Sequence, residues 1–325
     1  MEADELVKLI KQNKTVVVSL VQKTISALAK SSYFDEFQAN EYINEIVNIC
    51  FSPRRLFSSP RIVINGDSSD FHNLCVELAR QDYYDKSCMV IESGLHYYPR
   101  SVNLLADYIA YGLQCGKYSK CERYYKILQA IPIADWTWRA FDFSIDYLLD
   151  RSEKTILSTS DKKKIESLIN SFKKQYPNDE RAFLQEAMYN QYQNNEEQEI
   201  AALEYAAKNI HLSPKCSLKL AQIYLSKGNY SASNEILDEC KIQYMHPDFV
   251  NNIGEIYAQS VMCEMAIFYI ELNELSDDDR EKKAMKIYSD FMACNKTDIR
   301  GTKRFEDLTI LIDIFSEKSG FPFSF

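Results

Sequence analysis

The amino-acid sequence predicts an all-α protein built from consecutive helical hairpins. Only 8 glycines and 8 prolines occur among 325 residues, too few for the many tight turns of an all-β sandwich or barrel. Apolar residues recur three and four positions apart over long stretches, as on the buried face of an amphipathic helix. Prolines punctuate the middle of the chain: Pro99, Pro132, Pro177, Pro214 and Pro247 are separated by 33, 45, 37 and 33 residues. A recurrence of this length is typical of a repeat array.

Two helices are expected before the repeats. Apolar residues from Leu6 to Leu28 keep one helical face, although Val16-Val17-Val18 locally resembles a strand. A helix is favoured there because the same face continues on both sides of the valines. A second helix is expected over Phe34–Cys50, followed by a Pro-, Gly- and Ser-rich connector. Residues 1–67 therefore form an N-terminal helical segment and connector.

Each stretch between two prolines divides into two helical runs around a short polar turn. Leu74–Arg80 and Ser87–Tyr97, for example, flank Asp82–Asp85. A proline ends the second run, because it cannot donate the helical hydrogen bond and it disfavours α geometry in the preceding residue. Each unit is therefore predicted to be a helical hairpin.

These units resemble tetratricopeptide repeats, helix-turn-helix units of about 34 residues. The family has bulky residues at positions 4, 7, 11 and 24, small residues at positions 8, 20 and 27, and proline at position 32. A unit that begins at Ser68 places suitable residues at all eight positions: Phe71, Leu74, Leu78 and Ile91; Cys75, Ser87 and Gly94; and Pro99. The resemblance implies a right-handed α-solenoid.

Further units match this pattern less completely. A unit from Val102 has Ile109 where a small residue is expected. The units from Pro214 and Pro247 follow each other directly, and the second would place Ala266 and Ile270 on its second helix. We expect the repeat array to cover residues 68–275.

Two hairpins in the middle of the array depart from the pattern. Trp136–Arg151 suits a first helix, but Ser152–Ser160 resembles an insertion before a second helix at Lys163–Tyr176. Residues 181–212 form another hairpin with an unusually polar turn. These two units are degenerate versions of the repeat.

Capping helices and an aromatic tail are expected over residues 276–325. Ser276 precedes Asp277-Asp278-Asp279, a typical helix start with acidic residues in the first turn. A last helix over Phe305–Phe315 would close the array, because terminal repeats need an atypical capping element. The tail residues Phe321, Phe323 and Phe325 are expected to pack on this helix, with a docking peptide as the alternative.

Composition limits the classes of partner. The net charge of -9 makes a nucleic-acid partner unexpected, because a broad cationic surface is missing. The N-terminus is acidic where a secretory signal would be basic, and no apolar run approaches the roughly 20 residues of a membrane-spanning helix. Nine cysteines without a Cys-x-x-Cys pair predict reduced, mostly buried thiols and no metal site. We expect a soluble cytoplasmic protein without membrane contact.

No enzyme motif stands out in the sequence. It has no Gly-x-Gly-x-x-Gly, no phosphate-binding loop, no His-Glu-x-x-His and no Gly-x-Ser-x-Gly. We therefore expect a non-catalytic protein without a cofactor. Trp136 and Trp138 lie two residues apart and point in different directions from a helix, so one of them could face a ligand while the other packs in the core.

The resemblance implies that a concave groove is lined by the first helix of each repeat. His72 could contact a ligand there or be an ordinary solvent-facing residue. The Lys and Asn clamp by which some family members capture the acidic tails of chaperones is missing, and the mixed apolar and polar lining suits a helix or an extended peptide. The candidate groove residues are His72, Val76, Arg80, Asn103, Gln114, Lys215, Gln222, Asn251 and Glu255.

Two functions follow from this groove. The first is a scaffold or complex subunit that binds a peptide or helix of a partner protein. The alternative is a regulatory sensor, similar to bacterial receptors whose repeats bind a signalling peptide and control an effector. Residues 1–50 carry several lysines but no turn typical of a DNA-binding helix-turn-helix. The partner and the oligomeric state stay open, a homo-oligomer included.

Overall fold

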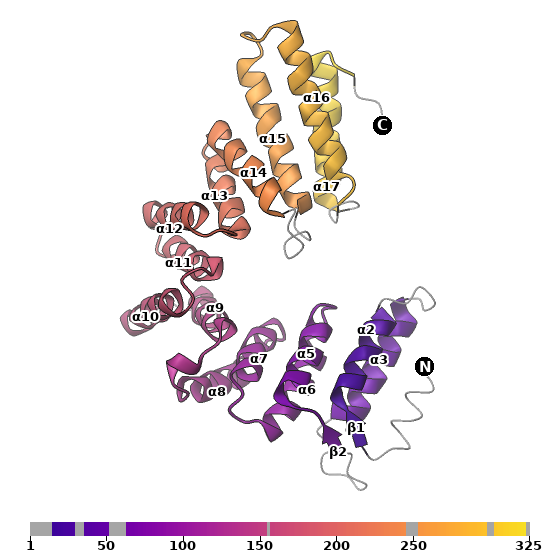
Figure 1. The fold of residues 1–325 in the computed structure, drawn as a ribbon, viewed down its shortest axis with the longest axis vertical. Coiled ribbons are helices and arrows are strands. Elements are labelled where there is room, and N and C mark those ends of the chain that lie inside the picture. The colour runs from indigo at the N-terminus through magenta and orange to yellow at the C-terminus, as the bar shows by residue number, and fades with distance from the viewer. Residues whose placement is uncertain are drawn as a thin grey trace. The chain divides into compact units, whose positions relative to one another are not determined.

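The computed structural model describes residues 15–29, 36–51, 63–154, 157–244, 253–297 and 302–322 (Figure 1). The chain divides into two compact units, Met1–Gln175 and Tyr176–Phe325. Within the described ranges, helices dominate both units and one pair of short strands lies in the first. None of the helices in these ranges is both long enough and apolar enough to cross a lipid bilayer.

The first unit begins with two short strands and two helices, β1 (Thr15–Val17), α2 (Val18–Ala29), α3 (Glu36–Phe51) and β2 (Val63–Asn65). Strand β1 pairs with β2 in parallel, and Val16 lies opposite Ile64. The predicted helix through the valines is therefore wrong for Thr15–Val17. Valine and threonine suit an extended backbone, and the partner strand supplies the hydrogen bonds. From Val18 onward the predicted helix is confirmed. Helix α2 buries Val21, Ile25 and Leu28 of the expected face, whereas Leu20 is exposed.

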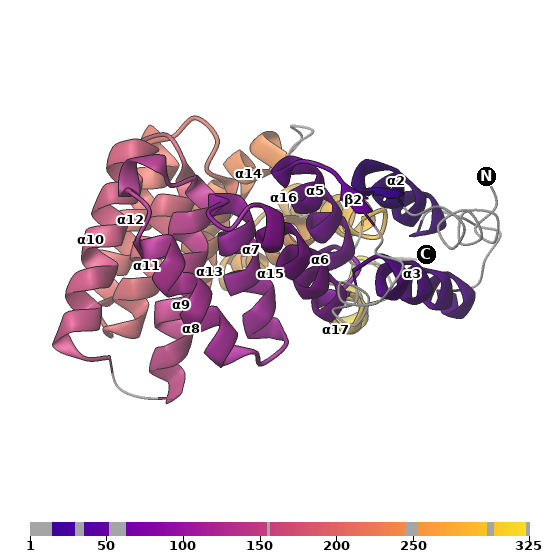
Figure 2. The same ribbon diagram turned by 90° about the horizontal axis from the view of Figure 1, so that it is seen from below.

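In the part of the chain that the structure describes, three helical hairpins follow in the first unit, and three more with a final helix lie in the second (Figures 1 and 2). The first three are α5 (Ser68–Ala79) with α6 (Tyr84–Tyr97), α7 (Val102–Gln114) with α8 (Tyr118–Gln129), and α9 (Trp138–Lys154) with α10 (Thr159–Gln175). The others are α11 (Glu180–Tyr192) with α12 (Glu196–Asn209), α13 (Pro214–Ser226) with α14 (Tyr230–Tyr244), and α15 (Ile253–Glu271) with α16 (Asp277–Cys294), followed by α17 (Lys303–Ser319).

Small residues bring the two helices of a hairpin close together. The Ser87 hydroxyl on α6 donates to the Cys75 carbonyl on α5 at 2.9 Å, and the Ser233 hydroxyl on α14 donates to the Ala221 carbonyl on α13 at 2.8 Å. Both bonds join repeat position 20 to position 8. A Cβ on Gly94 would lie only 2.9 Å from the Phe71 ring, so position 27 has no room for a larger residue in this hairpin. The predicted repeat register is confirmed here.

The turns of four hairpins place one residue in the left-handed region of backbone conformation. These residues are Asp82, Gly116, Asn194 and Gly228, with φ angles of 59°, 67°, 56° and 74°. The first two are 34 residues apart, and so are the last two. Glycine adopts this conformation freely, and Asn and Asp tolerate it better than most residues. The same turn conformation therefore recurs in hairpins that have Asp or Asn at this position instead of glycine.

Two hairpins differ from the sequence-based prediction. Most of the expected insertion at Ser152–Ser160 belongs to the ends of α9 and α10, since Ser158 accepts a hydrogen bond from the backbone N–H of Asp161 at 3.1 Å and begins α10. Farther on, Ala266 and Ile270 lie on α15, not on a second helix. Helix α16, expected as a cap, therefore forms the second helix of that hairpin. No glycine or proline interrupts α15 after Gly254, so the helix continues.

Helices α16 and α17 are the last helices of the second unit. Ser276 caps α16 by accepting from the Asp279 N–H. Phe315 on α17 and Phe291 on α16 are buried in one cluster, and Phe321 packs against it. The predicted packing of the aromatic tail is confirmed for Phe321, while Phe323 and Phe325 lie outside the described residues.

Candidate functional site

The candidate site lies on the surface that the first helices of the first unit's hairpins form together. Helices α5, α7 and α9 contact each other in succession. We call the side chains along these three helices the first-helix surface. The repeat length determines which side chains meet on this surface. Residues about 34 positions apart lie opposite each other on adjacent helices.

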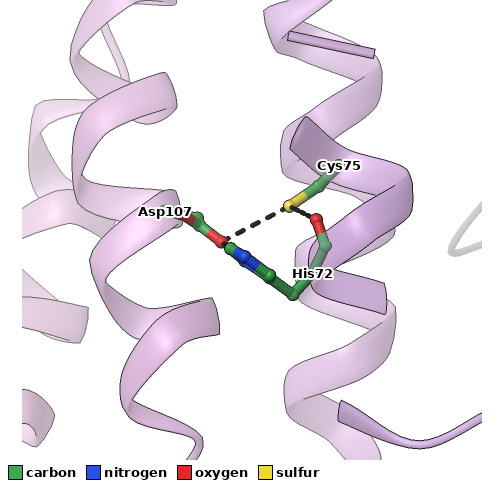
Figure 3. Close-up of side chains that lie close together, drawn as sticks. All are labelled: His72, Cys75 and Asp107. Carbon is green, nitrogen blue, oxygen red and sulfur yellow. Dashed lines mark hydrogen bonds and ion pairs between the residues drawn. The ribbon is translucent and has the colours of Figure 1, made fainter. Parts of the chain in front are cut away.

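A buried carboxylate, Asp107, lies at the centre of this surface on α7. Its side chain is fully buried. The Oδ2 atom accepts from Nδ1 of His72 on α5 at 2.5 Å, and the Oδ1 atom accepts from Nε of Arg139 on α9 at 2.9 Å. Figure 3 shows His72 and Asp107 pointing at each other between two helices. A buried charge is stable only when it is paired and hydrogen-bonded, and both requirements are met here.

Arg139 is itself held in place from several sides. Its guanidinium donates to the Tyr111 hydroxyl at 3.4 Å and lies 5.0 Å from the Trp138 ring centre and 5.2 Å from that of Phe143. Burial alone would lower the pKa of Arg139, but Asp107, together with Tyr111 and Cys75, offsets this effect and the pKa is raised. Burial raises the pKa of Tyr111, with Asp107 adding to the effect. Both side chains therefore keep their ordinary protonation state at neutral pH.

The thiol of Cys75 completes the cluster. It lies one helical turn after His72, donates to the His72 carbonyl at 3.0 Å, and lies 3.6 Å from Oδ2 of Asp107 (Figure 3). Burial raises the pKa of Cys75 well above its usual range, and the charge of Asp107 raises it further. A catalytic cysteine needs a lowered pKa, which a cationic neighbour commonly provides, whereas burial and the charge of Asp107 raise the pKa of this thiol. The group is not an activated nucleophile.

A second bond joins α7 to Thr137, the residue just before α9. The Thr137 hydroxyl donates to Oδ1 of Asn103 at 2.9 Å. Asn103, one of the predicted groove residues, thus contacts the next repeat. Trp136 is buried, its indole N–H donating to the Ile131 carbonyl at 3.2 Å, and Trp138 is half-buried beside Arg139. Of the two tryptophans, only Trp138 borders the surface.

The remaining predicted residues of the first unit are exposed or half-buried. Arg80 has 73% of its side chain exposed, and Gln114 is also exposed. Val76 is half-buried on α5. His72 is neither an ordinary solvent-facing residue nor an open ligand contact, because its ring is engaged with Asp107 and only 20% of its side chain is exposed. The solvent-facing interpretation of His72 is wrong.

The predicted residues of the second unit lie on α13 and α15. Lys215 and Gln222 are exposed on α13. Glu255 on α15 accepts from Arg304 on α17 at 2.7 Å, so it ties the last helix to the array. Asn251 lies outside the described residues. Of the predicted residues that the structure describes in this unit, Lys215 and Gln222 are therefore the exposed ones on α13.

Sequence reasoning missed Asp107 and Arg139, the two residues that organise the first-helix surface. Asp107 is at position 6 of its repeat, between the groove positions that the resemblance implies. A charged residue in the middle of the apolar run Leu104–Leu113 was the available signal, because an unpaired charge is rarely buried there. The His72-x-x-Cys75 spacing was a second signal, since residues three apart share one helix face.

The cysteines elsewhere are mostly buried. Of the nine, only Cys115 is partly exposed, which confirms the predicted buried thiols. Burial raises the pKa of Cys88 to about 12 and that of Cys121 to about 11. These groups are neutral at physiological pH and contribute to packing.

Comparisons with known proteins find similar folds but no sequence relative. The chain matches no family model and no curated protein. Among solved structures it is similar to a thermophilic TPR protein of Thermus thermophilus, with a TM-score of 0.48 and 16% identity over 58% of this chain and 98% of that one. A tetratricopeptide repeat protein from Parabacteroides merdae has a TM-score of 0.49 and 13% identity, covering 90% and 99% of the two chains. PilF of Pseudomonas aeruginosa has a TM-score of 0.49 and 10% identity, covering 75% and 97%.

The fold itself defines a tetratricopeptide-like α-solenoid protein. The hairpins, their small-residue contacts and the recurring left-handed turns of this chain carry that assignment.

Proposed function

We propose that this protein is a non-catalytic interaction scaffold that binds a peptide or a helix of a partner protein along the first-helix surface. The observation that carries the proposal is the mixed character of this surface. Half-buried apolar side chains, among them Val76, Ala110 and Leu113, lie beside the exposed polar residues Arg80 and Gln114. Apolar contact with nearby polar groups is how grooves recognise peptides and helices.

Hydrogen bonds between the helices beneath this surface support partner binding. His72, Asp107 and Arg139 connect α5, α7 and α9, and the Asn103–Thr137 bond links α7 to the residue just before α9. A surface held in this way loses little conformational entropy when a partner binds, so modest contacts can sum to useful affinity. The bonds therefore support a preformed binding surface.

The second unit offers an equivalent set of side chains. Leu218 and Leu225 are half-buried on α13, with the exposed Lys215 and Gln222 between and beside them. We propose that this surface contributes to partner binding as well. The buried thiols fit the reducing cytosol, where we propose that the protein acts as a subunit of a complex.

The test compares two double variants with equal changes in charge. Arg80→Glu with Gln114→Glu alters the first-helix surface, and Lys163→Glu with Asn170→Glu alters exposed positions on α10, a second helix. Tagged proteins are purified from the native cytosol, and the recovered proteins and short peptides are identified by mass spectrometry. We expect a stoichiometric protein partner that is lost with the first double variant and kept with the second.

The other outcomes distinguish the alternatives. Loss of the partner with both variants, or with neither, would place binding elsewhere and contradict the proposed surface. A lone short peptide that depends on Arg80 and Gln114 would favour the signalling-sensor function over the scaffold.

A further inference from the structure

We propose that His72, Cys75 and Asp107 form a binding site for a zinc ion between the first two hairpins. Their three donor atoms, Nδ1, Sγ and Oδ2, all lie within 4.8 Å of one another. The site goes beyond the interaction function and does not depend on it.

The ligand set suits zinc better than other common ions. Zinc binds imidazole nitrogen, thiolate sulfur and carboxylate oxygen, whereas calcium and magnesium require oxygen ligands. Cys75 loses its proton when the ion binds. The resulting thiolate and the Asp107 carboxylate then offset the two charges of the ion, while the Arg139 guanidinium keeps its own charge beside Oδ1. Three protein ligands leave a fourth position for water, as in open zinc sites.

The local geometry brings the ligands together. His72 and Cys75 are three residues apart on α5 and therefore project from the same helix face toward α7 (Figure 3). The 3.6 Å between Sγ of Cys75 and Oδ2 of Asp107 matches the edge of about 3.5 Å that a tetrahedral zinc site requires. The 2.5 Å between His72 Nδ1 and Oδ2 is a hydrogen-bond distance, so the ring must withdraw by about 0.8 Å when the ion enters.

The surroundings allow that adjustment and orient the carboxylate. His72 is the most exposed of the three ligands, with 20% of its side chain exposed, so its ring is the one to shift when the ion enters from solvent. Arg139 donates to Oδ1 and leaves Oδ2 directed at the other two ligands. Metal-binding carboxylates are commonly held by such a hydrogen bond from an outer residue. Arg139 is therefore a positioning residue for the site.

The experiment measures zinc and cobalt binding to the full chain. The purified protein is stripped with a chelator and titrated with zinc in competition with a chromophoric chelator, and then with Co²⁺ alone. We expect one equivalent of zinc per chain, and for Co²⁺ an intense visible spectrum with a thiolate-to-cobalt charge-transfer band in the near ultraviolet. Circular dichroism checks that each protein is folded.

Two matched variants locate the site. Cys75→Ala removes the sulfur while it keeps the bonds of Asp107 to His72 and Arg139, and Cys88→Ala removes another buried thiol of the same hairpin. We expect Cys75→Ala to abolish the charge-transfer band and to weaken zinc binding by more than about 100-fold, beyond the effect usual for an outer residue. Cys88→Ala should bind as the unaltered chain does. His72→Gln provides an independent loss of a ligand if Cys75→Ala does not fold.

Several results would overturn the proposal. These are less than one equivalent of zinc at micromolar concentration, a cobalt spectrum without the thiolate band, or equal binding by the Cys75 and Cys88 variants. Because no partner enters the measurement, its failure would leave the proposed interaction function untouched.

Discussion

Replacement of Ala221 by leucine tests the packing that defines the repeat. Ala221 lies on α13 where α14 approaches most closely, and its side chain is fully buried against Leu237, Cys240 and Ile256. The Ser233 hydroxyl donates to its carbonyl at 2.8 Å, which keeps the two helices at this distance. A longer side chain must therefore push α14 away or adopt a strained rotamer.

The magnitude follows from two opposing terms. Leucine adds three carbons, whose burial would stabilise the fold by about 2.4 kcal/mol if space existed, at about 0.8 kcal/mol per carbon. No such space exists around a fully buried alanine at a helix contact, and overpacking of this kind costs about 1–3 kcal/mol net. The melting temperature should fall by about 2–4 °C for each kcal/mol in a unit of this size.

The assay is thermal unfolding followed by circular dichroism, with Ala201→Leu as the control. Ala201 lies on α12 in the same unit and is exposed, so its replacement should change stability by less than about 0.5 kcal/mol. An Ala221→Leu protein that melts at the same temperature as the control would refute the repeat register in α13 and α14.

Two further predictions concern a turn and a buried carboxylate. Gly228→Ala should lower the free energy of unfolding by about 1–2 kcal/mol in urea titrations, because φ at this position is 74°. The new Cβ would meet no close contact, since the nearest atom beyond the neighbouring residues, the Tyr230 hydroxyl, is 4.0 Å away. The cost therefore comes from backbone conformation and not from a clash. Gly228→Asn should lower the free energy of unfolding clearly less than Gly228→Ala does. Equal decreases for the two variants would contradict the explanation by backbone conformation. Burial raises the pKa of Glu264 above its ordinary 4.5, although Lys286 partly opposes the shift. The stability that Glu264 contributes is therefore fully present below pH 4.5 and is lost as the pH rises through its raised value. Urea titrations across this range measure the free energy of unfolding of Glu264→Gln and of the unaltered chain. The difference between them should move in favour of Glu264→Gln as the pH rises. A difference that moves in favour of the variant as the pH falls would contradict the direction of the pKa shift.

Much of the fold could be predicted because its causes are local. The spacing of apolar residues predicted the helices, and Pro99, Pro132 and Pro177 marked the ends of hairpins. Pro214 instead begins α13, and Pro247 lies outside the described residues. Ser276 before three aspartates gave the start of α16 to the residue. Small residues such as Ser87 and Gly94 gave the repeat register, because a single larger side chain at either position would separate the helices.

The errors arose where a distant segment decided the outcome. The residues around Val16 predict a helix, but Val16 pairs with Ile64 and therefore belongs to a strand. Helix α15 continues to Glu271 because α14 and α16 both pack along it, and a helix buried on several sides shows little periodicity in its apolar residues.

The candidate site shows the same division. The sequence by itself determined that His72 and Cys75 share one face of a helix, and that Arg80 and Gln114 lie at first-helix positions. Only the tertiary structure decided that Asp107 and Arg139 meet His72, because these residues come from three helices. The repeat brings residues about 34 positions apart into contact, and whether a buried carboxylate finds its partners depends on that stacking.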